Sequence, residues 1–349
     1  MKRKVFFAVA IIVSMATWAQ NIAVVSPSNS TDIYNTLDEA ITNADPSSTI
    51  YLPGGGFVIS DATTIDKKLT IIGVSHRGDT DNVDGATIIS GKLQFVGGSS
   101  GSAVVGVYVS GNIDVGTVGT EEEGSAAVTN FTLRYCNVNS ILVHNNGCVG
   151  ILVNQCYLRN TSEFSNTNVK VSNCIVHSLK DINGGTINHN VVTSNCPRYE
   201  YTGYTGWQIY SYRPFCEVSS STITNNIMLD WRDGLTGDNC YISNNCIGTG
   251  TWDSDQNPVV APEMPEGTNV WDEVFGEGNN KGVTIASDYH VQASWAKGAA
   301  SDGTDIGIYG GMGFSDKALA PIPRIVSKSV AEQSDASGKL TVTVTVKSN

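Results

Sequence analysis

The chain has 349 residues, enough to bury a large core, and 33 Asp and Glu residues outnumber 21 Lys and Arg residues for a formal net charge of −12. An acidic surface repels nucleic acids and anionic lipids, so both classes of partner fit this chain poorly. Glycine is abundant, at 36 residues, and only 15% of residues are charged, which is typical of a chain built from short strands and tight turns.

The N-terminus has the pattern of an export signal. Basic residues at 2–4 precede an apolar run at 5–13, and small residues before Ala19 offer a cleavage site, so we expect residues 1–19 to be a signal peptide. The apolar run is too short to span a bilayer, and no later segment predicts a membrane span. Cleavage would leave 18 basic and 33 acidic residues, a net charge of −15, and would place the chain in the cell envelope or secrete it.

The first elements after the signal are a short helix and several strands. Apolar residues at helical spacing predict a helix over 33–44, which the Ser and Thr at 30–31 can cap. Strands are then expected at 49–52, 57–59 and 65–73, with a Pro and Gly turn at 53–56.

A six-fold repeat dominates the middle of the chain. Each copy reads apolar, two residues, Asn or Cys, one residue, apolar, and the central positions are Cys136, Cys156, Cys174, Asn190, Asn226 and Asn245. Their spacings are 20, 18, 16, 36 and 19 residues, so four of the five steps share a period of about twenty. A single coil of this length cannot bury its apolar face, but stacked coils bury it against one another. The repeat predicts an all-β chain that folds as a right-handed parallel β-helix (solenoid) of about nine or ten coils. The right-handedness follows from the general rule for crossovers between parallel strands.

The Asn and Cys column is expected to be structural. It falls where the apolar pattern breaks, hence at a turn, and Asn tolerates the left-handed backbone region while its amide can bond to the Asn of the next coil. The Cys members fit as small buried thiols. No catalytic role is assigned to this column.

Both ends of the chain resemble the pectate-lyase-like superfamily of secreted β-helix proteins, which includes pectin methylesterases. In those proteins a short capping helix leads into an I-x-L-P-x-G strand and an L-T-I-x-G strand, matched here by 50–55 and 69–73. The close of the chain, around Asp288, Gly303 and Asp305, is similar to the last coil of many bacterial members. The resemblance covers about residues 30 to 313 and implies the fold, but the scaffold supports lyases, hydrolases, esterases and adhesins. The catalytic segments of pectin methylesterases and typical pectate lyases are not matched.

The expected organisation follows from these patterns. We expect a β-helix domain with a short N-terminal helical cap over 20–315 and a C-terminal β-strand tail over 316–349. Apolar residues alternate with Thr over 340–346, which predicts a strand with one buried face. We expect this strand to pair with 325–330 and to pack on the helix, covering its open end.

The long interval between Asn190 and Asn226 contains an aromatic insertion bracketed by Cys196 and Cys216. Seven of the chain's 28 aromatic residues lie there, and Tyr and Trp rings can stack on sugars while Arg can pair with a uronate carboxylate. The candidate substrate-binding residues are Arg198, Tyr199, Tyr201, Tyr204, Trp207, Tyr210, Tyr212 and Arg213. The alternative is a loop whose aromatic residues pack on the helix wall.

The cysteines that bracket this insertion, Cys196 and Cys216, are a disulfide candidate, since an exported protein permits the bond. No CxxC or Cys and His spacing predicts a zinc site, and no metal ligand is assigned.

An acidic stretch follows the insertion, and its candidate catalytic residues are Asp230, Arg232, Asp233 and Asp238. Lyases of the resembled superfamily need a cation, either Ca²⁺ or Arg and Lys, to neutralise a uronate, and a base to remove its C5 proton. Arg232 would be the neutralising group, or two of the carboxylates would share the work of hydrolysis. The alternative is a polar outer turn with an internal Asp–Arg pair. A groove could also collect residues of neighbouring coils, namely Arg159, His177, Lys180 and Asp181.

We therefore expect an exported protein that interacts with polysaccharide, as a lyase or a hydrolase, and that is a monomer. The alternative is a non-catalytic surface, adhesion or glycan-binding protein in which the same insertion binds a glycan. The sequence leaves open whether the chain is catalytic, whether Ca²⁺ binds and which glycan is recognised.

Overall fold

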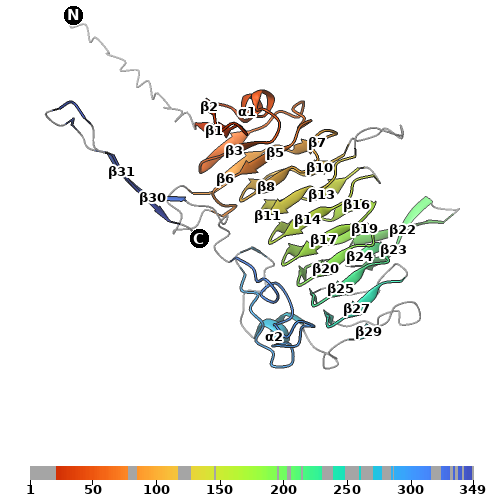
Figure 1. The fold of residues 1–349 in the computed structure, drawn as a ribbon. Coiled ribbons are helices and arrows are strands. Elements are labelled where there is room, and N and C mark those ends of the chain that lie inside the picture. Colours follow the sequence, from red (N-terminus) through yellow and green to blue (C-terminus); the bar gives the residue numbers. More distant parts are fainter. Residues whose placement is uncertain are drawn as a thin grey trace, which may run out of the picture.

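The fold is a stack of parallel strands in three sheets (Figure 1). The computed structural model describes residues 21–77, 85–116, 127–144, 147–194, 196–202, 206–213, 215–229, 239–247, 259–260, 270–276, 284–285, 287–315, 324–330, 333–334, 337–339 and 342–347. The expectation of an all-β parallel β-helix is confirmed, because from β3 onward each of the three sheets grows by parallel pairing with the next coil.

Twelve strands form the largest sheet. In spatial order they are β2 (Thr31–Tyr34), β1 (Ile22–Val25), β3 (Ser48–Tyr51), β5 (Leu69–Ile72), β8 (Ala103–Val105), β11 (Thr132–Arg134), β14 (Ile151–Asn154), β17 (Val169–Ser172), β20 (Thr186–Asn188), β25 (Thr222–Thr224), β27 (Tyr241–Ser243) and β29 (Val259–Val260). The first two pair antiparallel, and α1 (Leu37–Asn43) packs beside them. Thr36 caps α1 by accepting a hydrogen bond from the Glu39 backbone N–H, so the cap lies a few residues later than the sequence predicts.

Two smaller sheets complete each coil. The nine-stranded sheet contains β4 (Gly55–Val58), β6 (Thr87–Ser90), β9 (Tyr108–Val109), β12 (Asn137–Val138), β15 (Tyr157–Leu158), β18 (Ile175–Val176), β21 (Val191–Val192), β26 (Ile227–Met228) and β28 (Cys246–Ile247). The six-stranded sheet contains β7 (Leu93–Phe95), β10 (Ile113–Val115), β13 (Ile141–Val143), β16 (Ser162–Thr167), β19 (Leu179–Asn183) and β24 (Phe215–Ser219). Within a coil the chain visits the twelve-, nine- and six-stranded sheets in that order, as β11, β12 and β13 do.

The core is a set of stacked aliphatic columns. One column of the twelve-stranded sheet consists of Ile50, Ile71, Val104, Leu133, Val153, Val171, Ile187, Ile223 and Ile242, each in register with the next and at most 1% exposed. Burying each side chain in such a column contributes about 1.5–3 kcal/mol relative to leaving it exposed.

The Asn and Cys column forms the predicted ladder inside the solenoid. The backbone N–H groups of Cys174, Asn190 and Asn226 each donate to the side-chain oxygen of the next Asn, over 2.9 Å in every case. The amides of Asn190 and Asn226 also donate along the ladder, over 3.0 and 2.9 Å. Upstream, the Cys156 N–H donates to the Cys174 sulfur over 3.3 Å.

One detail of the sequence prediction is wrong, because the left-handed residue is not the ladder residue but the one before it. Positive φ angles of 52–60° occur in what we call the turn column, which consists of Tyr135, Gln155, Asn173, His189, Asn225 and Asn244. A left-handed residue reverses the alternation of side chains. The ladder residue therefore enters the core, whereas the residue before it points to the outside of the turn.

A segment that we call the strap, residues 287–315, lies on the outside of the nine-stranded sheet. It forms no further coil of the described sheets. With α2 (Val270–Phe275) it builds a second apolar cluster against the outward side chains Ile175, Val191, Ile227 and Cys246. Figure 1 shows this segment beside the last coils.

The tail forms the predicted antiparallel pair. Strands β30 (Arg324–Val330) and β31 (Val342–Lys347) pair with Ile325 opposite Val346 and Val330 opposite Val342. That this hairpin covers an open end of the solenoid stays a prediction. No helix in the described part of the chain is long and apolar enough to cross a membrane.

We predict that Asn226→Ala destabilises the fold by roughly 2–4 kcal/mol, because two buried donors of Asn190 would lose their acceptor. Chemical denaturation of both proteins measures this difference in the free energy of unfolding. Asn160→Ala is the matched control, since Asn160 is exposed and donates only to Asn139, and we expect a change within about 0.5 kcal/mol. An equal loss of unfolding free energy in the two variants would contradict a stabilising role for the inner Asn ladder.

Candidate functional site

The four predicted catalytic residues lie outside the described residues. Asp230, Arg232, Asp233 and Asp238 belong to the segment that joins β26 to β27, of which the structure describes only the flanks. Their proposed role therefore stays a prediction.

The aromatic insertion is an antiparallel hairpin of β22 (Cys196–Thr202) and β23 (Gly206–Arg213). It projects beyond β19 and β24 (Figure 1). The register pairs Tyr199 with Ile209 and Tyr201 with Trp207, so these four positions share one face.

The predicted arginines lie nearer the base of this hairpin than the aromatic positions. Arg198 is opposite Ser211 and Arg213 is opposite Cys196, and a register shift between Arg198 and Tyr199 separates these pairs from the aromatic positions. Tyr212 is opposite Pro197, on the same side of the shift as the arginines, whereas Tyr204 lies outside the described residues. Beyond the shift, the hairpin therefore has one face with three aromatic positions, Tyr199, Tyr201 and Trp207.

Cys216 is the second residue of β24, the strand that follows the hairpin, and it is disulfide-bonded. Six other cysteines are free and buried, namely Cys136, Cys148, Cys156, Cys174, Cys240 and Cys246. The pairing of Cys216 with Cys196 stays a prediction, because the Cys196 side chain lies outside the described part of the structure.

The outer surface of the six-stranded sheet carries a row of charged side chains, which we call the charged row. Its members are Lys92, Asp114, His144, Glu163, Lys180, Asp181 and Glu217. Lys92 lies 3.6 Å from one carboxylate oxygen of Asp114, and His144 lies 3.5 Å from the other. Lys180 lies 3.4 Å from Asp181 and 3.9 Å from Glu163. The row ends at β24, beside the aromatic hairpin.

Stacked left-handed residues bring adjacent residues of the charged row to the surface. Asp181 and Glu217 have φ angles of 58° and 54° and lie opposite each other, because Lys180 pairs with Cys216 and Ile182 with Val218. A left-handed residue within a strand interrupts the strict alternation of side chains. Consecutive Lys180 and Asp181 are therefore both partly exposed, at 31% and 25%.

The electrostatics of this end of the row are acidic. Partial burial would lower the pKa of Lys180, but the carboxylates of Asp181, Glu163 and Glu217 outweigh burial and raise it. The lysine is therefore a persistent cation rather than a proton acceptor.

Sequence reasoning placed Lys180 and Asp181 in one groove with His177 and Arg159, but the structure puts the first two in the six-stranded sheet and the other two directly after paired strands of the nine-stranded sheet. Lys180 and Asp181 belong to the charged row. Arg159 instead turns toward the nine-stranded sheet, where it stacks 4.6 Å from the ring of Tyr108 and donates to the Val109 carbonyl over 2.7 Å. Burial lowers the pKa of His177, whose Nδ1 lies 3.2 Å from the Ser178 hydroxyl.

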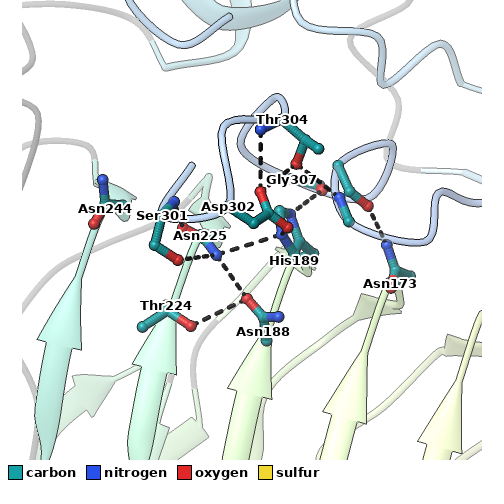
Figure 2. Close-up of polar contacts among 12 residues, drawn as sticks. Asn173, Asn188, His189, Thr224, Asn225, Asn244, Ser301, Asp302, Thr304 and Gly307 are labelled. Atoms are coloured by element: carbon teal, nitrogen blue, oxygen red, sulfur yellow. Dashed lines mark hydrogen bonds and ion pairs between the residues drawn. The ribbon is translucent and has the colours of Figure 1, made fainter. Parts of the chain in front are cut away.

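A second polar cluster lies where the turn column meets the strap (Figure 2). His189 is 1% exposed, its Nδ1 is 3.2 Å from the Gly307 carbonyl, and its Nε2 is 3.1 Å from a carboxylate oxygen of Asp302. The Asn225 amide nitrogen also lies 3.3 Å from Nε2. Both ring nitrogens of this buried histidine are therefore engaged by protein groups, and the cluster holds the strap against the turn column.

Five of the six residues of the turn column, from Gln155 to Asn244, contribute to that attachment. Asn173 donates to the carbonyls of Ile308 and Gly310, at 2.9 and 2.8 Å, and Asn244 donates to the Ala299 carbonyl over 2.8 Å. Asn225 accepts a hydrogen bond from the Ser301 N–H over 2.8 Å and donates one to the Ser301 hydroxyl over 2.9 Å. The Ser315 N–H donates to the side-chain oxygen of Gln155 over 2.9 Å. Five successive coils therefore hold one strap.

Comparison with known proteins adds no assignment, because no family model, no curated protein and no solved structure matches the chain. Among the described residues, no group of three or more His, Cys, Asp or Glu side chains is arranged to hold a metal ion.

We predict that the strap loosens in acid. Burial would raise the pKa of Asp302, but hydrogen bonds from Thr304 and the charge of His189 outweigh it and lower that pKa. A depressed pKa means that the carboxylate's contribution is complete above its ordinary value and is lost as the pH falls below about 4. Hydrogen exchange of the strap amides should accelerate over that range.

The variant Asp302→Asn should exchange roughly 5-fold faster at neutral pH, for a loss of about 1 kcal/mol, and should show less acid dependence. Asp288→Asn is the control, since Asp288 bonds to His290 within the strap. Identical exchange in wild type and Asp302→Asn would show that the pair does not hold the strap.

We also predict that non-reducing peptide mapping joins the Cys216 peptide to the Cys196 peptide. The six free cysteines should be alkylated only after denaturation, because they are buried. A link from Cys216 to any other cysteine would refute the pairing.

Proposed function

We propose that this chain is an exported glycan-binding protein that takes a polysaccharide on the charged row and the aromatic face of the β22–β23 hairpin. The observation that carries the proposal is the juxtaposition of these two surfaces at β24. The hairpin follows β21 and leads directly into β24, so its base is fixed at the end of the six-stranded sheet. Aromatic positions next to a row of hydrogen-bonding groups suit sugar rings, which have apolar faces and polar edges.

The charges of the row favour a neutral glycan over a uronate polymer. Both lysines of the row already lie within 4 Å of carboxylates, Lys92 with Asp114 and Lys180 with Asp181 and Glu163. A uronate would have to compete for these cations and would meet the surplus of carboxylates near β24. A neutral sugar needs only hydrogen bonds from the same groups.

Export is part of this proposal. The N-terminal signal pattern supports it, and a disulfide-bonded Cys216 fits an oxidising compartment. The resemblance of both chain ends to the pectate-lyase-like superfamily, together with the parallel β-helix, supports membership of that group of secreted proteins.

The test is affinity electrophoresis of the mature protein in gels that contain xylan, glucomannan, β-glucan or polygalacturonate. We expect retardation by a neutral polymer, and we expect Trp207→Ala and Tyr201→Ala to weaken binding by roughly 5- to 30-fold each, as loss of a stacking aromatic costs about 1–2 kcal/mol. Tyr241→Ala is the matched control, because Tyr241 is 49% exposed on the twelve-stranded sheet.

Two results would refute the proposal. One is unchanged mobility in every gel. The other is retardation that Tyr241→Ala abolishes while Trp207→Ala preserves it, which would place binding on the twelve-stranded sheet.

A further inference from the structure

Three groups at the N-terminal end of the charged row form a diagonal across neighbouring strands. Lys92 immediately precedes β7, Asp114 is the central residue of β10, and His144 immediately follows β13. The strands pair in register, with Asp114 opposite Gln94 on one side and Leu142 on the other. The lysine and the histidine therefore approach the same carboxylate from its two oxygens.

Asp114 is unusually covered for an outward-facing residue. Its neighbours Ile113 and Val115 are fully buried in the core, so its own side chain points outward, yet that side chain is only 8% exposed. Its Oδ1 atom is buried without a hydrogen bond, and so is the facing Nε2 of His144, 3.5 Å away. Two buried polar atoms that face each other without a hydrogen bond cost stability, and such pairs call for a functional explanation.

The two orphaned atoms complement each other. A proton on Nε2 would satisfy Asp114 Oδ1 after a small approach, and it would leave Nδ1 as the unprotonated nitrogen. The described residues give Nδ1 no hydrogen bond, Nδ1 is not one of the buried unpaired atoms, and the His144 side chain is 23% exposed. Because Nε2 is buried, the exposed part of the imidazole lies elsewhere on the ring, and Nδ1 is the nitrogen left to face the proposed glycan.

We propose that His144, positioned by Asp114, is a general base that hydrolyses an O-acyl ester carried by the bound glycan. This inference rests on the proposed function, because it places the substrate on the charged row. Nδ1 takes a proton from a water molecule as the water oxygen bonds to the ester carbonyl carbon. The resulting oxyanion lies near the ammonium of Lys92, which is 37% exposed. When this tetrahedral intermediate collapses, the bond between the acyl carbon and the sugar oxygen breaks, and the sugar oxygen receives the proton from Nδ1. The products are a free acid and a sugar hydroxyl.

The same geometry disfavours hydrolysis of a glycosidic bond and elimination from a uronate. Acid-assisted hydrolysis of a glycosidic bond needs a carboxylic acid that can reach the leaving oxygen, and Asp114 is covered. Elimination from a uronate would bring a permanent carboxylate to a surface on which Lys92 and Lys180 already lie within 4 Å of carboxylates. Ester hydrolysis needs no general acid at a glycosidic oxygen, and the only negative charge that it brings to Lys92 is the transient oxyanion.

The experiment measures acetate released from acetylated xylan and acetylated glucomannan by the mature chain, across pH. The rate should rise as the imidazole loses its proton, and His144→Gln should lower kcat by about 100-fold or more without weakening retardation in the xylan gel. Asp114→Asn should lower kcat and leave KM almost unchanged, because the imidazole would lose the carboxylate that positions it and the glycan would still bind. In this variant Glu163, which lies on the next strand in register with Leu142, remains as a carboxylate on the same outer surface of the six-stranded sheet.

A matched control exists in the strap, where His290 Nδ1 lies 2.7 Å from the carboxylate of Asp288 and the His290 side chain is 51% exposed. His290→Gln should leave acetate release unchanged. Thermal melts of all variants separate loss of chemistry from loss of fold, and Lys92→Met provides a second variant that should reduce kcat more than it raises KM.

The outcomes are distinguishable from failure of the proposed function. Retardation in the gels without acetate release, or acetate release that survives His144→Gln, overturns the ester-hydrolysis inference and leaves glycan binding standing. Unsaturated products or new reducing ends in place of acetate overturn it as well. Absence of both retardation and release overturns both proposals.

Discussion

The backbone N–H groups at one turn of each coil impose the constraint on which this solenoid depends. At that turn the chain leaves the twelve-stranded sheet, and the N–H groups of Cys174, Asn190 and Asn226 point inward, where water cannot satisfy them. The next Asn along the stack supplies the acceptor, at 2.9 Å each time. Since the acceptor comes from the neighbouring coil, each coil is satisfied only when another is stacked on it, and this makes the fold cooperative along its axis.

The same turn also organises the outside of the molecule. The left-handed residue before each ladder position sends its side chain outward, so a column of polar groups arises as a by-product of the inner ladder. The strap occupies that column and covers the adjoining nine-stranded sheet, using Ile175 and Val191 as its apolar floor. The six-stranded sheet has no such cover in the described structure, and its charged groups and aromatic hairpin are the surface available for a ligand.

The sequence predicted those features that repeat or that occupy consecutive positions. The spacing from Cys136 to Asn245 predicted the stack and the ladder, and the alternation at 340–346 predicted the pairing of β31 with β30. The strap escaped prediction because its bonds join Asn173 to Gly310 and His189 to Asp302, residues more than a hundred positions apart with no local pattern. Lys92, Asp114 and His144 escaped it for the same reason, since only the register of three coils brings them together. The signal that could have found them is one ionisable residue within or next to each of these segments, since Lys92 precedes β7, Asp114 lies within β10 and His144 follows β13.

The strap also fixes the number of coils that lie between its first and last anchors. Its anchors occur on five consecutive coils, from Gln155 to Asn244, and successive coils are separated by the strand spacing of about 4.8 Å. Adding or deleting one coil inside that span would displace every later anchor by that distance, and the strap would have to gain or lose chain to match. Coils before Gln155 are free of this requirement. Changes in the length of such a solenoid should therefore accumulate toward its N-terminal half, while the number of coils under the strap stays fixed.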